Sequence, residues 1–283
     1  MSDSTRDKPP KTAAENPMSD AAMAYFKTGD RSHRRVLDFA LDLVPVRSVV
    51  DFGTARGGWL RAAKAAGVAE IQGFDIVDTP AEDLVIPPQA FSCTDLGQPL
   101  ALGRRYDLAI STEVAEHIAF DRAGTFIDNV TSASDFVIFS AAPPYQDGAG
   151  HVNELWAEYW AKHFQARGFT CYDILRPRFW HDAAVRSYYR QNLLIFARAK
   201  VAGALAAKGL APTALPLSMI HPEQYLKVIG RALPPEWRRI AEDVTLYYDC
   251  VTKAPETLDA DPGRHRYGKD SVGWRAILER YGL

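Results

Sequence analysis

The feature that most constrains this chain is an alternation of short apolar runs, rich in β-branched residues, with stretches of helical spacing. The first run covers residues 48–53, ends in glycine and precedes a helix-compatible stretch at 59–66. Alternation of this kind predicts an α/β fold, with a mostly parallel twisted sheet and helices on both faces. Further strands are expected at 70–75, 90–93, 106–111, 135–141, 169–174 and 192–198.

The segments that flank the alternating region have a different character. Residues 1–20 are polar and lack the apolar stretch of a secretion signal, which predicts a disordered tail. Two N-terminal helices are expected between residues 20 and 44, and a helical extension beyond residue 200. Helical patterns of that extension lie at 201–207, 222–231, 235–243 and 272–281. The predicted domains are therefore a tail at 1–20, a main domain at 21–199 and a helical extension at 200–283.

Charge and hydropathy exclude several classes of protein. The chain has 33 basic and 35 acidic residues, a formal charge of -2, and no dense basic stripe, which argues against a nucleic-acid partner. No uninterrupted apolar run approaches the ~18 residues of a membrane span. Three scattered cysteines without CxxC spacing fit buried, reduced thiols, so we expect a cytoplasmic protein.

Acidic residues stand at the ends of the first three predicted strands, where ligands of an open α/β sheet bind. Asp51 precedes a glycine-containing turn, Asp75 ends the second strand, and Asp95 follows the third. A carboxylate at these places can accept hydrogen bonds from an ammonium, from ribose hydroxyls or from an adenine amino group. Phe74 or Leu96 is the candidate to pack on the adenine ring.

These motifs resemble those of the class I, Rossmann-like, S-adenosylmethionine-dependent methyltransferases, over residues 46–198. The resemblance implies that Asp51, Gly53 and Gly57 hold the methionine part of the cofactor and that Asp75 binds the ribose, with Asp95 at the adenine. One departure is Ala55, which replaces the usual second glycine. An NAD-dependent oxidoreductase is the alternative, but the glycines do not follow G-x-G-x-x-G.

A second constellation follows the fourth strand. Glu113, Glu116 and His117 are spaced by three and four residues, which on a helix places them on one face. With His151, from the loop after the fifth strand, they form a candidate site for a divalent cation such as Mg, Mn, Fe or Zn. E-x-x-E-H with a later histidine resembles the metal set of the small-RNA 2′-O-methyltransferases and ubiquinone-pathway O-methyltransferases. The alternatives are His117 as a metal-free general base and a surface helix without a chemical role.

The candidate acceptor-binding residues are aromatic and polar. Tyr145 lies in the loop that carries His151, and Trp180, Tyr189 and Arg190 precede the last strand. Such groups suit a sugar, glycan or other small polar acceptor, although they would equally well close the sheet edge. Metal-assisted activation of a hydroxyl favours O-methylation, whereas His117 alone favours a phenol or amine. A nucleotide-binding module without catalysis is the non-enzyme alternative.

Overall fold

The computed structural model describes residues 31–232. The predicted tail, the first of the two N-terminal helices and the helical patterns at 235–243 and 272–281 lie outside these residues. Within them, all seven predicted strands are confirmed, each to within three residues at either end. The strands are β1 Ser48–Phe52, β2 Glu70–Asp75, β3 Phe91–Cys93, β4 Leu108–Thr112, β5 Phe136–Ser140, β6 Thr170–Tyr172 and β7 Leu194–Ala197.

The strands form one twisted sheet in the order β3-β2-β1-β4-β5-β7-β6. The first five pair in parallel, and β7 runs antiparallel to both β5 and β6. The sequence of crossovers reverses between β1 and β4, which is the switch point where ligands of such sheets bind. The fold is therefore the Rossmann-like arrangement that the alternation predicts.

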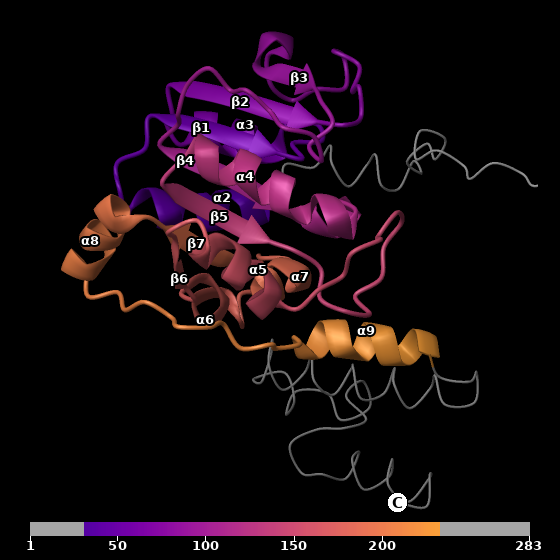
Figure 1. Cartoon of the computed structure of the whole chain (residues 1–283). Coiled ribbons are helices and arrows are strands. Elements are labelled where there is room, and N and C mark those ends of the chain that lie inside the picture. Colours follow the sequence, from indigo (N-terminus) through magenta and orange to yellow (C-terminus); the bar gives the residue numbers. More distant parts are fainter. Residues whose placement is uncertain (1–30, 233–283) are drawn as a thin grey trace, which may run out of the picture.

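Helices cover both faces of this sheet (Figure 1). In the view shown, α4 and α5 lie in front of the sheet, with α2 and α3 behind it, and α9 lies beyond the end of the sheet near α7. The helices are α2 Arg31–Leu41, α3 Gly58–Ala65, α4 Ala123–Ala133, α5 Ala157–Gln165, α6 Leu175–Phe179, α7 Ser187–Asn192, α8 Ala199–Ala207 and α9 Pro222–Ala232. Within residues 31–232, short 3-10 turns lie at Pro88–Ala90, Ala115–His117 and Phe120–Arg122.

Two apolar cores result, one on each side of the sheet, because successive strand residues point to opposite faces. In β1, Val49 joins the core under α2 and α3, whereas Val50 joins the core under α4 and α5. Burial on both faces explains why β1, β4 and β5 are continuous buried runs without polar alternation.

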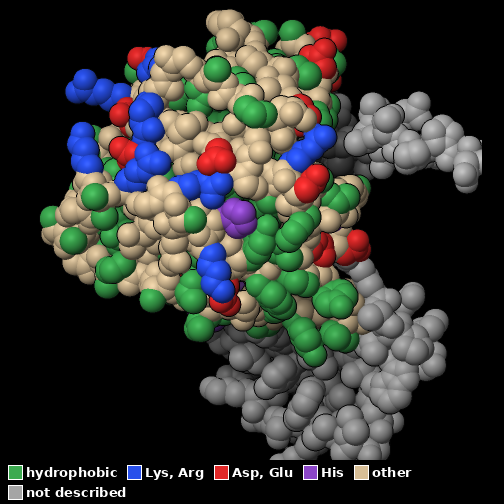
Figure 2. Space-filling view, in the orientation of Figure 1, with side chains coloured by type: hydrophobic (Ala, Val, Ile, Leu, Met, Phe, Trp, Pro, Cys, Tyr) green, Lys and Arg blue, Asp and Glu red, His purple; other side chains and the backbone are tan. Residues whose placement is uncertain are grey.

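The outer surface of the α4 side carries mixed charge (Figure 2). Arginine side chains there stand beside carboxylates, as in the ion pairs Arg105–Asp135 and Arg122–Asp95. None of the described helices combines the length and the apolar character needed to cross a bilayer.

Candidate functional site

The turn after β1 is shaped by two glycines that have little room for a side chain. Gly53 has φ +82°, and a Cβ there would lie 2.2 Å from Val114 Cγ2. Gly57 has φ +90°, and a Cβ there would meet the Ile86 side chain at 2.7 Å. Both positions therefore require glycine, for conformation as well as for space.

Asp75 fastens this turn to the end of β2. Its Oδ2 accepts a hydrogen bond from the Ala55 amide at 2.7 Å, and its Oδ1 accepts one from the Val77 amide at 2.9 Å. Ala55, which stands where the family has glycine, has φ +49° and so takes the left-handed conformation despite its Cβ. Each oxygen of Asp75 keeps a lone pair, which leaves capacity for hydroxyl donors.

Asp51 is almost completely buried, at 1% exposure, and its Oδ2 has no hydrogen-bond partner among the described residues. Burial raises the pKa of this carboxyl to about 7; the Thr54 hydroxyl lowers it and the charge of Asp75 raises it further. Asp51 and Asp75 belong to the adjacent parallel strands β1 and β2, so both lie toward the same edge of the sheet. That the two carboxylates share one cofactor pocket stays a prediction.

The residues predicted to hold the adenine are placed differently. Leu96 is buried in the α4-side core, and the Phe74 ring stacks on Phe52, so both are packing residues in this structure. Asp95 accepts a hydrogen bond from the Gly97 amide at 2.9 Å and faces Arg122. Exposed apolar side chains do follow Asp75, at Ile76 and Val77, which are 63% and 62% exposed.

The sequence did not indicate the role of Arg56. This side chain is buried, its Nε donates to the Asp83 carbonyl at 2.7 Å, and its guanidinium also pairs with the Asp83 carboxylate. The Val85 amide donates to the Arg56 carbonyl at 2.9 Å, so the segment after β2 is bound to the glycine turn. The sequence signal was a charged residue inside a glycine-containing turn. Its partner, Asp83, lies 27 residues further along the chain, so the sequence did not indicate the pairing.

The prediction that Glu113, Glu116 and His117 begin a helix was wrong. Glu113 has φ +55°, and only a 3-10 turn follows, at Ala115–His117. The left-handed conformation of Glu113 follows the last residue of β4, Thr112, and begins the turn. The three side chains are therefore brought together by this turn, without the regular face of an α-helix.

A candidate metal centre is formed by Glu116, His117 and His151. One ligand atom from each lies within 4.8 Å of the others, and His151 Nε2 is 4.0 Å from Glu116 Oε1. Glu116 is fully buried, yet neither of its oxygens has a hydrogen-bond partner of normal geometry among the described residues. Burial, together with the charge of Glu113, raises the pKa of Glu116 well above its ordinary value.

In both histidines, Nδ1 makes a hydrogen bond to a described residue, whereas Nε2 makes none within the described part of the chain. His117 Nδ1 lies 3.2 Å from the Gly150 carbonyl, and His151 Nδ1 lies 2.7 Å from Glu154 Oε1. Carbonyl and carboxylate oxygens only accept, so Nδ1 carries the proton in each ring. Burial, together with the nearby His151, lowers the pKa of His117, while the charge of Asp75 raises it. The cluster therefore lies within electrostatic reach of the acid that ends β2.

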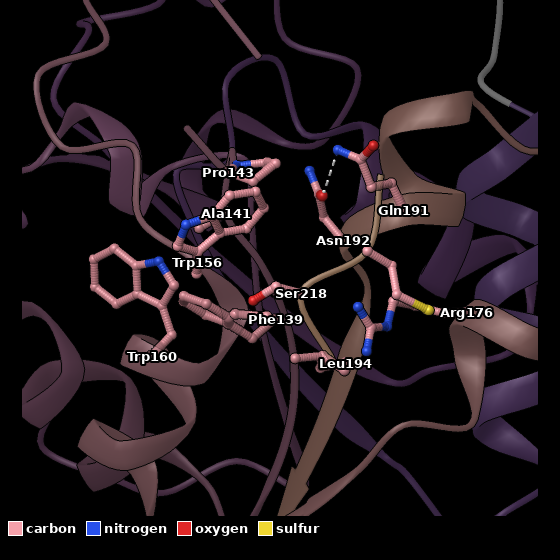
Figure 3. A pocket seen from close by; sticks show the side chains of 12 residues that line it. Phe139, Ala141, Pro143, Trp156, Trp160, Arg176, Gln191, Asn192, Leu194 and Ser218 are labelled. Carbon is pink, nitrogen blue, oxygen red and sulfur yellow. Dashed lines mark hydrogen bonds between the residues drawn. The ribbon is translucent and has the colours of Figure 1, made fainter. Parts of the chain in front are cut away.

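Glu113 lies beside this cluster in a network of neutral donors. Its carboxylate accepts from the Ser140 hydroxyl at 2.7 Å, from Gln146 Nε2 at 2.6 Å and from Asn192 Nδ2 at 3.0 Å. Gln191 extends the network through Asn192 into a small cavity walled by Trp156 and other aromatic side chains (Figure 3). That cavity measures about 10 Å³, room for one water at most, so it does not hold an acceptor.

The predicted acceptor residues are spread over surface and core. Tyr145 is 81% exposed, and Trp180 is partly buried against His221. Tyr189 is buried against Trp59, and Arg190 is buried and paired with Glu223 at 2.6 Å. The packing of Tyr189 and the ion pair of Arg190 give these two residues a structural role, whereas the exposed Tyr145 side chain is accessible to a ligand.

Tyr145 also lines a hollow next to the candidate metal centre. This hollow, of about 580 Å³, falls within the usual range of small-molecule sites. His151 and Glu154 form part of its wall, and Val228 of α9 lies at its rim. The described residues that line it are Tyr145, Asp147, Gly148, His151, Val152, Asn153, Glu154 and Val228.

Comparison with known proteins agrees with this geometry. Residues 25–128 match a family model described as a methyltransferase domain, and they include the glycine turn, Asp51, Asp75 and the 113–117 turn. The chain carries a methyltransferase domain. No curated protein matches the chain at a significant level.

Solved structures with a similar fold include two methyltransferases and the protein DesVI. Magnesium protoporphyrin IX methyltransferase from Synechocystis PCC 6803, with bound SAM, is 21% identical, with 64% of this chain and 77% of that chain covered and a TM-score of 0.42. The sugar N-methyltransferase KedS8 from Streptoalloteichus sp ATCC 53650 is 14% identical, with 70% and 98% covered and a TM-score of 0.47. DesVI from Streptomyces venezuelae is 12% identical, with 65% and 100% covered and a TM-score of 0.47. Likenesses of this level do not identify the acceptor of the methyltransferase described here.

Proposed function

We propose that this methyltransferase binds S-adenosylmethionine at the glycine turn and transfers the methyl group to a hydroxyl of a small polar metabolite, sugar or glycan. In the transfer, the acceptor oxygen forms a bond to the methyl carbon as the bond from that carbon to sulfur breaks. The acceptor's proton must leave as well. The methyl group is already activated by the sulfonium, so the protein must align the acceptor and remove that proton.

The cofactor assignment is supported by the unsatisfied polar capacity of the pocket. Asp51 has a buried oxygen without a partner, which suits the ammonium of the methionine part. Asp75 retains lone pairs for the ribose hydroxyls, and Ile76 and Val77 offer apolar contact for the adenine. We propose these two side chains as adenine contacts beside the predicted Phe74 and Leu96.

The single observation that carries the metal assignment is the buried, unpartnered carboxylate of Glu116 facing two histidines. An isolated buried carboxylate is costly, and a cation would offset that cost. Two imidazoles and one carboxylate suit Mn²⁺, Fe²⁺ or Zn²⁺ better than Mg²⁺, which prefers oxygen ligands. We propose Glu116, His117 and His151 as ligands, and Glu113, beside Glu116, as the fourth.

A divalent cation at this place would lower the pKa of an acceptor hydroxyl by stabilising the alkoxide. The chain's own residues supply the rest of the arrangement. Gly150 and Glu154 hold the two imidazoles in one tautomer, and the hollow lined by Tyr145 receives the acceptor. In the metal-free alternative, the lowered pKa of His117 keeps this imidazole neutral and able to accept a proton from a phenol or amine.

Titration of the metal-stripped protein with Mn²⁺ distinguishes these mechanisms. We expect wild-type protein to bind one Mn²⁺ and Glu116→Gln to bind it roughly 100-fold more weakly, because an amide cannot supply the ligand charge. The control is Glu158→Gln, which alters an exposed carboxylate paired only with Lys162. Wild-type protein that binds neither Mn²⁺, Fe²⁺ nor Zn²⁺ would contradict the metal-assisted mechanism and favour His117 as the base.

A further inference from the structure

Glu154 makes three hydrogen bonds, of which only the one to His151 enters the proposed function. Its Oε1 accepts from His151 Nδ1 at 2.7 Å and from the Asp147 amide at 2.7 Å. Its Oε2 accepts from the Tyr145 amide at 2.8 Å. A single carboxylate therefore joins a proposed metal ligand to the turn that lines the acceptor hollow.

The turn that Glu154 holds has an unfavourable backbone. Tyr145 has φ +68° and Asp147 has φ +64°, so two residues with side chains adopt the left-handed conformation within three positions. Such a backbone persists when surrounding contacts fix it. Glu154 accepts from the amides of these same two residues, so its carboxylate is one of the contacts that fix the turn, together with the hydrogen bonds that Gln146 makes to Pro143 and Glu113.

The residues between the turn and the histidine are equally specific. At Gly148, a Cβ would lie 2.2 Å from His151 Nε2, so any side chain there would displace the ring. Gly150 has φ +77°, and its carbonyl accepts from His117 Nδ1. The loop thus orients both imidazoles while Glu154 fixes its beginning.

We propose that Glu154 is a positioning residue that couples occupancy of the metal centre to the shape of the Tyr145–Asp147 turn, and hence to acceptor binding. This inference rests on the proposed metal centre. A cation held by His151 would make Nδ1–H a stronger donor, which would strengthen the bond to Glu154. The coupling is reciprocal, so a turn held by Glu154 also favours cation binding.

The test combines Mn²⁺ titration with amide hydrogen exchange over residues 143–154 of the full-length protein. In wild-type protein we expect Mn²⁺ to slow exchange of the Tyr145 and Asp147 amides. In Glu154→Gln we expect Mn²⁺ affinity to fall roughly 10- to 100-fold and the Mn²⁺-dependent slowing to disappear. Glu158→Gln should behave like wild type.

A second variant reaches the same coupling by a different route. Gly148→Ala leaves the Glu154 carboxylate in place but pushes the His151 ring away, so we expect weaker Mn²⁺ binding and a smaller effect of Mn²⁺ on the turn. This variant keeps the test valid if Glu154→Gln does not fold.

The outcomes separate the two proposals. If wild-type protein binds no Mn²⁺, the metal centre fails and the coupling fails with it. If wild-type protein binds Mn²⁺ and Glu154→Gln binds it equally well, the metal centre stands and the coupling is overturned. If the turn amides of Glu154→Gln exchange faster while its Mn²⁺ affinity is unchanged, Glu154 only stabilises the turn, and the coupling is likewise overturned.

Discussion

Asp51 and Glu116 are acids enclosed at the carboxyl edge of the sheet with oxygens that no described residue satisfies. Unpaired buried carboxylates are costly, and most buried polar atoms in folded proteins find partners. The unpartnered oxygens of these two acids therefore suit ligands that carry positive charge: the cofactor's ammonium at Asp51 and the proposed cation at Glu116.

The pKa of about 7 for Asp51 predicts a specific pH dependence of stability. Between the ordinary value of 3.8 and about 7, the empty folded protein keeps a proton that the unfolded chain has lost. The free energy of unfolding should therefore fall as pH rises through this window, by roughly 4 kcal/mol at most. Thermal unfolding of wild type and Asp51→Asn at pH 5 and pH 8 checks this, since the variant should lose less stability over the interval.

The same carboxyl predicts that cofactor binding depends on pH in the opposite sense. An ammonium beside Asp51 favours the ionised carboxylate, so binding of S-adenosylhomocysteine below pH 7 should release a proton. Affinity should fall about tenfold for each pH unit below that point. Calorimetry in buffers of different ionisation enthalpy measures the release, and binding at pH 6 without it would show that Asp51 does not meet the ammonium.

At the scale of single elements, the strands were predictable because β-branched apolar runs bounded by glycine and polar residues have few alternatives. The 113–117 turn was not predictable, since spacings of three and four occur in a 3-10 turn after a left-handed residue as well as in an α-helix. The burial of Leu96 and the stacking of Phe74 on Phe52 were not predictable either. A residue at a strand end can face the core or the ligand, and the sequence alone does not say which.

The glycine turn allows a matched test of this local geometry. Gly53→Ala meets both a positive φ and a contact of 2.2 Å with Val114, whereas Gly67→Ala meets a φ of +93° with nothing within 4 Å. We expect Gly67→Ala to cost about 1 kcal/mol and Gly53→Ala clearly more, together with loss of cofactor binding. Denaturant unfolding gives both values, and equal costs would show that the close approach of Val114 has no consequence.

At the scale of the whole molecule, the order of strands brings acids distant in sequence to one edge. Asp51, Asp75 and the candidate metal centre follow neighbouring strands, so the proposed cofactor pocket and that centre lie along one edge of the sheet, and His151 also lines the hollow. The strand pattern alone predicts that these acids lie along the carboxyl edge of the sheet. The partners Arg56–Asp83 and His151–Glu154 were not, because nothing in the local sequence specifies which loop residues meet across a turn.

Calorimetric titration with S-adenosylhomocysteine is the measurement that tests the proposed cofactor pocket most directly. The geometry predicts that wild-type protein binds this ligand, that Asp75→Ala weakens binding at least tenfold, and that Asp78→Ala, an exposed acid three residues along, leaves it unchanged. Absence of binding heat with wild-type protein, or equal affinity in the Asp75→Ala variant, would contradict a cofactor pocket formed by the acids at the ends of β1 and β2.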